Sequence, residues 1–373
     1  MKEKPFVLLT LSLLSVPALG DTAKEAWRAD LERRLEQFES RQRLQKTESA
    51  EKDRIIEALR QQWGSGNEVP GWLRDIDFSG LIEVEANQVS PDQGSRSSDI
   101  KVATVELGMV SRVNDWVGAE LLLLYEEESD NDGDLNIDTA LITLADLGAN
   151  WFVKAGRGTL PFGVYPTYML SDPLTLELGE TNDSAVEAGY AVEGLNFSLF
   201  LFQGDHSDKV DDLGAQFGYQ ARREGFAYSF NLSYLNNLAE SNGIVDGGWI
   251  SGNDKRPGWA VSLEFGLGPW NLVGEYLAAS EGFADAGGDE PAAYNLEVAY
   301  AFERVGRPWT LAVGCQATDD AASAQWGLPE KRLLGSLSLE LVRQTRIGVE
   351  YRRDRDYTGD RSDTLTAQLA VTF

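Results

Sequence analysis

The chain has 373 residues, of which 42% are hydrophobic, and it carries a formal net charge of −27 at pH 7. This charge argues against nucleic acid as a partner, because an acidic surface repels a polyanion. The single cysteine, Cys315, excludes an internal disulfide. No stretch beyond the N-terminus approaches the roughly 18 consecutive apolar residues of a membrane-spanning helix, which excludes a helical inner-membrane protein.

Residues 1–20 have the pattern of a secretory signal peptide. Lys2 and Lys4 precede an apolar run over residues 6–16, and small residues follow at Ala18 and Gly20. The apolar run has about 11 residues, which is too short to cross a bilayer as a helix. We therefore predict cleavage near Gly20 and export of the mature chain from the cytoplasm.

Residues 21–63 have a helical pattern with balanced charge, ten basic and ten acidic residues. Apolar residues occupy the a and d positions of one heptad register at both ends, whereas the middle is polar at these positions. The pattern fits a weak coiled coil, which would allow a homotrimer, and equally an amphipathic helix that lies on a barrel or is disordered in the periplasm. Residues 64–75 contain Gly64, Gly66 and Pro70 and are predicted to form a linker. The heptad positions are Leu31, Leu35, Phe38, Ile56, Leu59 and Trp63.

From Ile76 onward, apolar and polar residues alternate, which is typical of strands that face two different environments. In the final strand, apolar residues from Leu365 to Phe373 occupy every second position. Runs of this kind predict about sixteen strands of roughly ten residues, and a transmembrane barrel needs an even number of such strands. We therefore predict that residues 76–373 form an all-β outer-membrane barrel of about 16 antiparallel strands, in a bacterium with two membranes.

The connections between these strands alternate in length, as in barrels with short periplasmic turns and long outer loops. Trp116, Trp151, Trp270 and Trp309 lie beside short turns, where an indole suits the lipid headgroup level. With the N-terminus in the periplasm, the long outer connections fall at about residues 90–98, 126–134, 157–183, 203–212, 236–257, 280–292, 317–330 and 354–363.

The same register predicts an acidic barrel interior. The inward positions carry many glutamates and few basic residues, which favours cations or neutral solutes. The alternative is that these glutamates pair with arginines and brace the barrel. The inward glutamates are Glu83, Glu85, Glu106, Glu120, Glu264, Glu275, Glu297, Glu340 and Glu350, and the inward basic residues include Lys154, Arg346 and Arg352.

The third long loop contains more apolar residues than a water-exposed loop needs, in the runs 154–163 (KAGRGTLPFG) and 171–181 (SDPLTLELGET). A loop that folds into the interior and narrows it would explain them. Arg157, Asp172, Glu177 and Glu180 are then the candidate constriction residues. A loop that packs over the rim, or against a neighbouring subunit, is the alternative.

Together with the signal peptide, the helical segment and the strand over 117–126 (VGAELLLLYE), these two runs resemble the LbtU-type siderophore porin family. The likeness extends over essentially the whole mature chain and implies uptake of a ferric siderophore without an energy-coupled plug. The GR-x-x-x-PFG run is also similar to phosphate-selective porins, although a phosphate pore needs Lys and Arg in place of Glu. Phe373 resembles the terminal aromatic residue of outer-membrane proteins, which implies recognition by the barrel-assembly machinery.

Signs of metal binding or catalysis are few. Residues 128–134 (ESDNDGD) resemble the start of a calcium loop but lack the later bidentate glutamate. An acidic loop that contacts lipopolysaccharide through divalent cations, or is simply solvated, explains them better. His206 is the only histidine, and we predict no enzyme, metal site or cofactor. Three functions remain: a siderophore channel, a general or anion-selective porin, and a structural barrel that tethers the envelope.

Overall fold

The computed structural model describes residues 76–127, 133, 135–145, 150–206, 208–223, 225–248, 255–321 and 327–373. The chain divides into two units, Met1–Val69 and Pro70–Phe373. The predicted signal peptide, helical segment and linker fall on residues 1–75, which lie outside the described residues. None of the helices in the described ranges has the length and apolar character of a membrane span.

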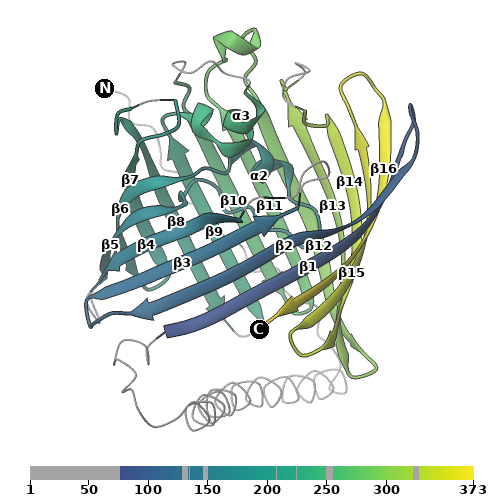
Figure 1. Cartoon of the computed structure of the whole chain (residues 1–373), viewed down its shortest axis with the longest axis horizontal. Coiled ribbons are helices and arrows are strands. Elements are labelled where there is room, and N and C mark those ends of the chain that lie inside the picture. Colours follow the sequence, from purple (N-terminus) through teal and green to yellow (C-terminus); the bar gives the residue numbers. More distant parts are fainter. Residues whose placement is uncertain are drawn as a thin grey trace, which may run out of the picture. The chain divides into compact units, whose positions relative to one another are not determined.

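Sixteen antiparallel strands close into a barrel (Figure 1). Each strand pairs with its neighbours in the chain, and β16 returns to pair with β1. This confirms the predicted fold class. The strands are β1 (Ile76–Pro91), β2 (Ser97–Arg112), β3 (Val117–Glu126), β4 (Leu135–Leu144), β5 (Trp151–Thr159), β6 (Asn182–Val192), β7 (Leu195–Phe202), β8 (Asp212–Arg223), β9 (Phe226–Leu235), β10 (Gly258–Leu267), β11 (Trp270–Ala279), β12 (Ala292–Arg304), β13 (Arg307–Asp319), β14 (Lys331–Val342), β15 (Thr345–Arg355) and β16 (Arg361–Thr372).

Alternation along the strands gives the barrel an apolar outer surface. In β16, the side chains of Leu365 and Leu369 are 48% and 44% exposed, whereas Thr366 and Gln368 between them are 7% and 6% exposed. Similar outward apolar residues occur on the other strands, and exposing them to water would cost about 25 cal/mol per Å². The outer surface is therefore suited to lipid, and the polar face lines the interior.

Long connections and short turns lie at opposite ends of the strands. Figure 1 shows α3 (Asn242–Gly247) among the long connections and the C-terminus at the other end. Trp116 and Trp151, beside short turns, have ring centroids 6.2 Å apart, and Trp270 lies 4.7 Å from Tyr300. Such rings favour the headgroup level of a membrane, so this end of the barrel has the aromatic belt expected at a lipid interface.

Four of the long connections pack into one apolar core against inward residues of β7 to β12. The third loop contains α2 (Leu174–Gly179), the fifth contains η2 (Leu238–Glu240) and α3, and the sixth contains η3 (Ala284–Ala286). This loop core covers one side of the barrel, so the free interior lies toward the other side. Its loop members are Leu160, Phe162, Leu174, Leu178, Leu238, Ala239, Ile244, Phe283, Ala286, Ala321 and Leu328.

Phe373 takes part in the closure of the barrel. The backbone N–H of Gly80 donates to the carbonyl oxygen of Phe373 at 2.8 Å, and the N–H of Phe373 donates back to Gly80 at 3.0 Å. The Phe373 ring lies over Gly80, where a Cβ atom would overlap it. The terminal aromatic side chain therefore fits a position that only glycine leaves open.

Candidate functional site: a constricted acidic passage

The third loop, residues 160–181, lies inside the barrel against the wall from β9 to β15. Its backbone N–H groups donate to inward side chains of several strands in turn. Gly163 donates to Ser233 Oγ of β9 at 2.9 Å, and Leu174 donates to Gln316 Oε1 of β13 at 3.2 Å. Residues between them bond to β11, β12 and β15 through three glutamates. The loop is thus attached to much of the inner wall.

Glu275, Glu297 and Glu350 are the three glutamates, with 4%, 0% and 1% of their surface exposed. Glu275 accepts the N–H of Val164 at 2.8 Å and the hydroxyl of Thr175 at 2.7 Å. Buried backbone N–H groups need acceptors, and a carboxylate is a strong one. The loop therefore obtains its hydrogen bonds from the wall.

The remaining contacts follow the same scheme. Glu297 accepts the N–H of Tyr168 at 2.6 Å and the hydroxyl of Thr167 at 2.8 Å. Glu350 accepts the N–H of Leu170 at 2.6 Å and also the hydroxyl of Ser171. These glutamates are predicted from sequence either to set ion selectivity or to pair with arginines. The structure instead gives them the loop backbone as partner, which sequence alone does not reveal.

Arg332 of β14 holds the loop from another side. Its guanidinium donates to Glu177 Oε1 at 2.8 Å, to Asp354 Oδ1 at 2.9 Å and to the carbonyl oxygen of Asp172 at 3.1 Å. Its side chain is only 5% exposed. Sequence reasoning missed this residue, although its inward position on β14 follows from the alternation of the outward Leu333 and Leu337.

A cavity of about 1010 Å³ lies between the third loop and the opposite wall, and it is here called the acidic passage. Leu170, Ser171, Asp172 and Glu177 line it from the loop, and β1, β2, β3, β15 and β16 supply the rest. Its charged lining is dominated by carboxylates. Seven of them, Glu83, Glu85, Asp99, Glu106, Glu126, Asp172 and Glu177, face two cations, Lys101 and Arg352.

Two loop carboxyl groups have raised pKa values. Burial raises the pKa of Glu180 to about 7, and the nearby carboxylates of Asp172, Asp138 and Glu126 act in the same direction. Burial and the neighbouring Glu177 also raise the pKa of Asp172, which Arg332 partly opposes. Both shifts arise first from burial and then from the neighbouring carboxylates, because each disfavours the charged form of a carboxyl group. The charge at this level therefore depends on pH near neutrality.

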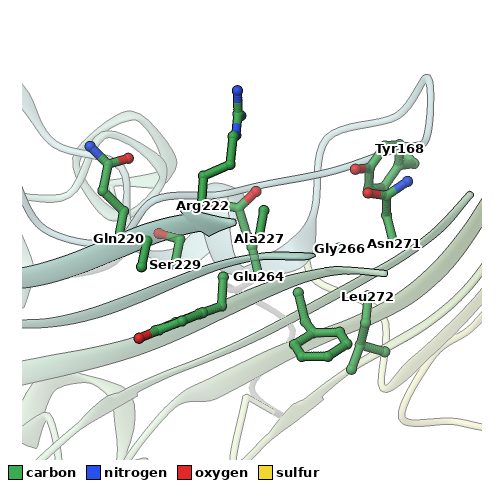
Figure 2. Close-up of a pocket in the computed structure, with 12 residues that line it drawn as sticks. Tyr168, Gln220, Arg222, Ala227, Ser229, Glu264, Gly266, Asn271 and Leu272 are labelled. Atoms are coloured by element: carbon green, nitrogen blue, oxygen red, sulfur yellow. The ribbon is translucent and has the colours of Figure 1, made fainter. Parts of the chain in front are cut away.

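Glu264 lines a second cavity of about 580 Å³ (Figure 2). The cavity lies where β8, β9, β10 and β11 meet short turns, and Tyr168 of the third loop borders it. Gln220, Arg222 and Asn271 add polar groups to its lining. Glu264 therefore belongs to the interior on the short-turn side of the loop.

Of the three basic residues predicted for the interior, Arg352 lines the acidic passage, whereas Lys154 and Arg346 are absent from its described lining. Lys154 pairs with Glu187 at 3.4 Å, beside a small cavity of about 50 Å³ on the β5 and β6 wall. Arg346 is the second residue of β15 and lies opposite Glu340 and Ala370 in the strand register, near the short-turn end.

Arg157 is predicted from sequence to belong to the constriction, and the structure shows that this is wrong. It lies within β5 and pairs with Ser184 of β6, and the next pair on the same face is Ala155 with Val186. Val186 is 53% exposed on the outer surface, so Arg157 also points outward. Strand pairing continues to Thr159, and the loop therefore begins later than the glycines around Arg157 suggest.

His206 contacts the fifth loop. Its Nδ1 lies 3.2 Å from Glu240 Oε2, and the Glu240 side chain is 1% exposed and also accepts the N–H of Asp205 at 2.7 Å. The residues that the structure describes contain no group of three or more side chains arranged to hold a metal ion. Most of the calcium-like stretch 128–134 lies outside those residues.

A closed barrel of sixteen strands with its third loop inside defines the protein as a porin-like β-barrel. Solved structures with a similar fold include Pseudomonas putida OprB, with a TM-score of 0.59 and 10% identity over 80% of this chain and 94% of OprB. Salmonella typhi OmpF has a TM-score of 0.55 and 13% identity, over 80% of this chain and 97% of OmpF. A Rh. blastica porin mutant has a TM-score of 0.52 and 11% identity, over 80% of this chain and 100% of that porin. At these identities the likeness concerns the fold.

Curated relatives are more similar in sequence. A UPF0422 protein of Coxiella burnetii is 26% identical over 312 residues, 78% of this chain and 66% of the relative. A UPF0422 protein of Legionella pneumophila (strain Philadelphia 1) is 24% identical over 356 residues, 80% of this chain and 66% of the relative. The chain thus spans just under two thirds of the length of these relatives. No protein-family model matches the chain. These relatives are not named for a solute, and the resemblance to LbtU-type porins stays a prediction.

Proposed function

We propose that the protein is a passive outer-membrane channel for small polar solutes, with a preference for cationic and uncharged ones. The observation that carries this proposal is the lining of the acidic passage, where seven carboxylates face Lys101 and Arg352. Rings of carboxylates favour cations in a pore because they raise the local cation concentration. Of the seven, Glu177 is neutralised in part by Arg332, and the other carboxylates still outnumber the two cations.

The structural role of the buried glutamates supports the same assignment. Glu275, Glu297 and Glu350 bond to the loop and are almost completely buried, so they contribute little to the surface that a solute meets. Selectivity is therefore assigned to the carboxylates of β1, β2 and β3 and to Asp172. A phosphate-selective pore is disfavoured, because the carboxylates that line the passage would repel an anion.

Within this function, we propose a ferric siderophore of positive or zero net charge as the solute. The support is the resemblance of the third-loop sequence to LbtU-type porins and the size of the passage, since cavities for small molecules usually measure about 300–1,000 Å³. The acidic lining restricts the proposal to siderophores without net negative charge. An anionic ferric siderophore would meet the same repulsion as phosphate.

Single-channel recording of the full-length protein in a planar bilayer tests the proposal. In a salt gradient, we expect a reversal potential of the sign for cation preference. A cationic ferric siderophore should reduce the current in a saturable manner, whereas an anionic one and inorganic phosphate should leave it unchanged. Anion preference would overturn the assigned selectivity, and current without any siderophore block would leave a general cation-preferring porin.

Matched variants connect the result to the passage. Glu83→Gln with Glu106→Gln removes two carboxylates from the lining, and we expect weaker cation preference. Asp115→Asn with Glu303→Gln removes two exposed carboxylates beside short turns, and we expect no change. An equal effect of both pairs would mean that overall charge, and not the passage, sets the selectivity.

A further inference from the structure

The outer surface of β14, β15 and β16 contains a row of three cations. Lys331 is paired with Arg355 in the strand register, and Arg355 is paired with Arg361. They share the face of Leu333 and Leu365, which are 57% and 48% exposed. All three cations therefore point outward, at the end of the barrel that carries the long connections. We call this set the cationic row.

Three like charges side by side are unfavourable. Directly opposed residues of an antiparallel pair have Cβ atoms about 4.5–5.5 Å apart, and like charges there destabilise the sheet. The chain carries a net charge of −27, so its overall composition does not account for a local concentration of cations. An anion bound at this surface would remove the repulsion.

The carboxylates near the row only partly neutralise it. Glu330 lies 2.5 Å from Arg355 and 3.5 Å from Lys331. The neighbouring Asp363 is engaged by Arg353 at 2.6 Å and 3.0 Å. No described residue makes an ion pair with Arg361. Asp363 also interacts electrostatically with Arg361. Two carboxylates, Glu330 and Asp363, thus serve four cations, the three of the row and Arg353, and the surface keeps a net positive charge.

The position of the row identifies the type of anion. From the row toward the middle of the strands, the outward residues become apolar. Leu333, Tyr351 and Leu365 come first, and Leu337 and Val349 lie farther along. The row therefore lies at the edge of the apolar belt, at the headgroup level of the outer leaflet. Guanidinium groups bind phosphate through two parallel hydrogen bonds, and basic clusters at this level bind phosphorylated headgroups.

We propose that the cationic row binds the phosphate group of a phosphorylated lipid in the outer leaflet. Lys331, Arg355 and Arg361 contact the phosphate, while the acyl chains lie on the apolar surface below them. The proposal depends on the membrane orientation derived above but not on the solute that the channel carries. A loss of conductance and a loss of lipid binding are measured separately, so failure of either proposal can be recognised.

Native mass spectrometry of the full-length protein in a phosphate-free detergent tests the proposal. The probes are lipid A with both phosphates, the same lipid after dephosphorylation, and inorganic phosphate as competitor. We expect about tenfold tighter binding of the phosphorylated lipid, a difference of about 1.4 kcal/mol. Lys331→Gln, Arg355→Gln and Arg361→Gln together should remove this difference, and inorganic phosphate at equal concentration should not displace the lipid.

A control variant carries the same change in charge at the opposite end of the barrel. Arg112→Gln, Arg304→Gln and Arg343→Gln change three exposed arginines beside short turns, and lipid binding should stay within about twofold of the unmodified protein. Equal loss in both triple variants, or equal binding of both lipids, would overturn the proposal. Displacement of the bound lipid by inorganic phosphate would mean that the cationic row binds free phosphate and not a lipid.

Arg361→Gln provides a second test in case the triple variant does not fold. This variant loses no ion pair of the described residues, so the barrel should form normally. Weaker binding of the phosphorylated lipid, with binding of the dephosphorylated lipid unchanged, is the expected result. Unchanged binding of both lipids would contradict the role assigned to the row.

Discussion

Arg332 of β14 donates to Glu177 of α2 at 2.8 Å, and this ion pair joins the barrel wall to the helix that borders the acidic passage. The same guanidinium bonds to Asp354 and to the carbonyl oxygen of Asp172. The 5% exposure of its side chain means that water cannot replace these partners easily. The position of Asp172 and Glu177 in the wall of the passage is therefore supported by a residue that is not among the described lining residues.

Replacing Arg332 should loosen the third loop without opening the barrel. Arg332→Gln leaves Glu177 and Asp354 without their cation. We expect the free energy that holds the loop to the wall to fall by on the order of 2–3 kcal/mol. This is less than for a fully buried pair, because the Glu177 side chain is 35% exposed. More frequent current fluctuations and faster protease cleavage within residues 160–181 should follow. Arg353→Gln breaks an outward ion pair with Asp363 and should leave both readouts unchanged. Loss of the barrel in Arg332→Gln would contradict a role confined to the loop.

The buried glutamates should affect loop attachment more than selectivity. Glu297→Gln and Glu350→Gln keep an oxygen acceptor but replace charge-assisted hydrogen bonds, at a cost of about 1 kcal/mol or more per residue. We expect a noisier current with an almost unchanged reversal potential. A shift of the reversal potential as large as that of the Glu83→Gln, Glu106→Gln variant would contradict this. It would mean that the glutamates bonded to the loop also set the ion selectivity.

Cation preference should decrease on acidification through about pH 7. Glu180 has a pKa of about 7 and the pKa of Asp172 is also raised, so lowering the pH protonates loop carboxyl groups and removes negative charge beside the passage. The pKa of Glu180 is about 7 in the folded protein and 4.5 in its ordinary, unfolded environment. Between these pH values the folded protein binds the proton more tightly than the unfolded chain, so the attachment of the loop should become stronger as the pH falls from about 7 to about 4.5. Reversal potentials at about pH 8 and about pH 6 measure the effect. Glu180→Gln should reduce the difference, whereas Glu290→Gln in the sixth loop should preserve it.

A side chain at Gly80 should impair barrel closure. Gly80→Ala places a Cβ atom within the Phe373 ring, so the ring must move from the β1 and β16 junction. We expect a lower yield of folded barrel, measured by the mobility difference between heated and unheated samples in gel electrophoresis. Gly335→Ala is the matched control, because no atom lies within 4 Å of its new Cβ. Equal yields of the two variants would show that the Phe373 ring adapts.

Deletion of residues 21–63 separates the channel from the tethering function. All described residues that line the passage belong to the barrel unit, so we expect the shortened protein, with its signal peptide kept, to conduct with the same selectivity. Envelope attachment is the second readout, measured as sensitivity of cells to detergent. Normal conductance with weakened attachment would support a tether formed by this segment, and lost conductance would give it a part in the pore.

The sequence predicts the barrel well, because the strands face lipid on one side and a largely polar interior on the other. Leu365, Leu369 and Val371 show this period directly, and the strand number follows from counting such runs. The individual site residues are harder to predict. Alternation places Glu83 and Glu297 equally in the interior, but one lines the passage and the other is bonded to the third loop. That difference depends on where the loop backbone lies, and no local pattern encodes it.

The error at Arg157 has a related cause. Glycines on both sides of this residue suggest a loop, because glycine is common in turns and weakens strands. Pairing with β6 nevertheless continues through Gly158 and Thr159. Arg332 was missed because its importance comes from Glu177, which is distant in sequence and reaches it only through the inward fold of the loop.

At the level of the third loop, the loop core fills the side of the barrel next to β7 to β12, and this bears on where a membrane voltage falls. Because the third loop lies inside the barrel, we expect the electrical resistance to be highest at its level. Most of the voltage drop should then fall at the level of the carboxylates of β1 to β3 and of the loop. Asp172 and Glu177 lie on a segment held by hydrogen bonds to wall side chains and by one principal ion pair. An applied voltage therefore acts most directly on a part of the wall that is attached without backbone strand pairing.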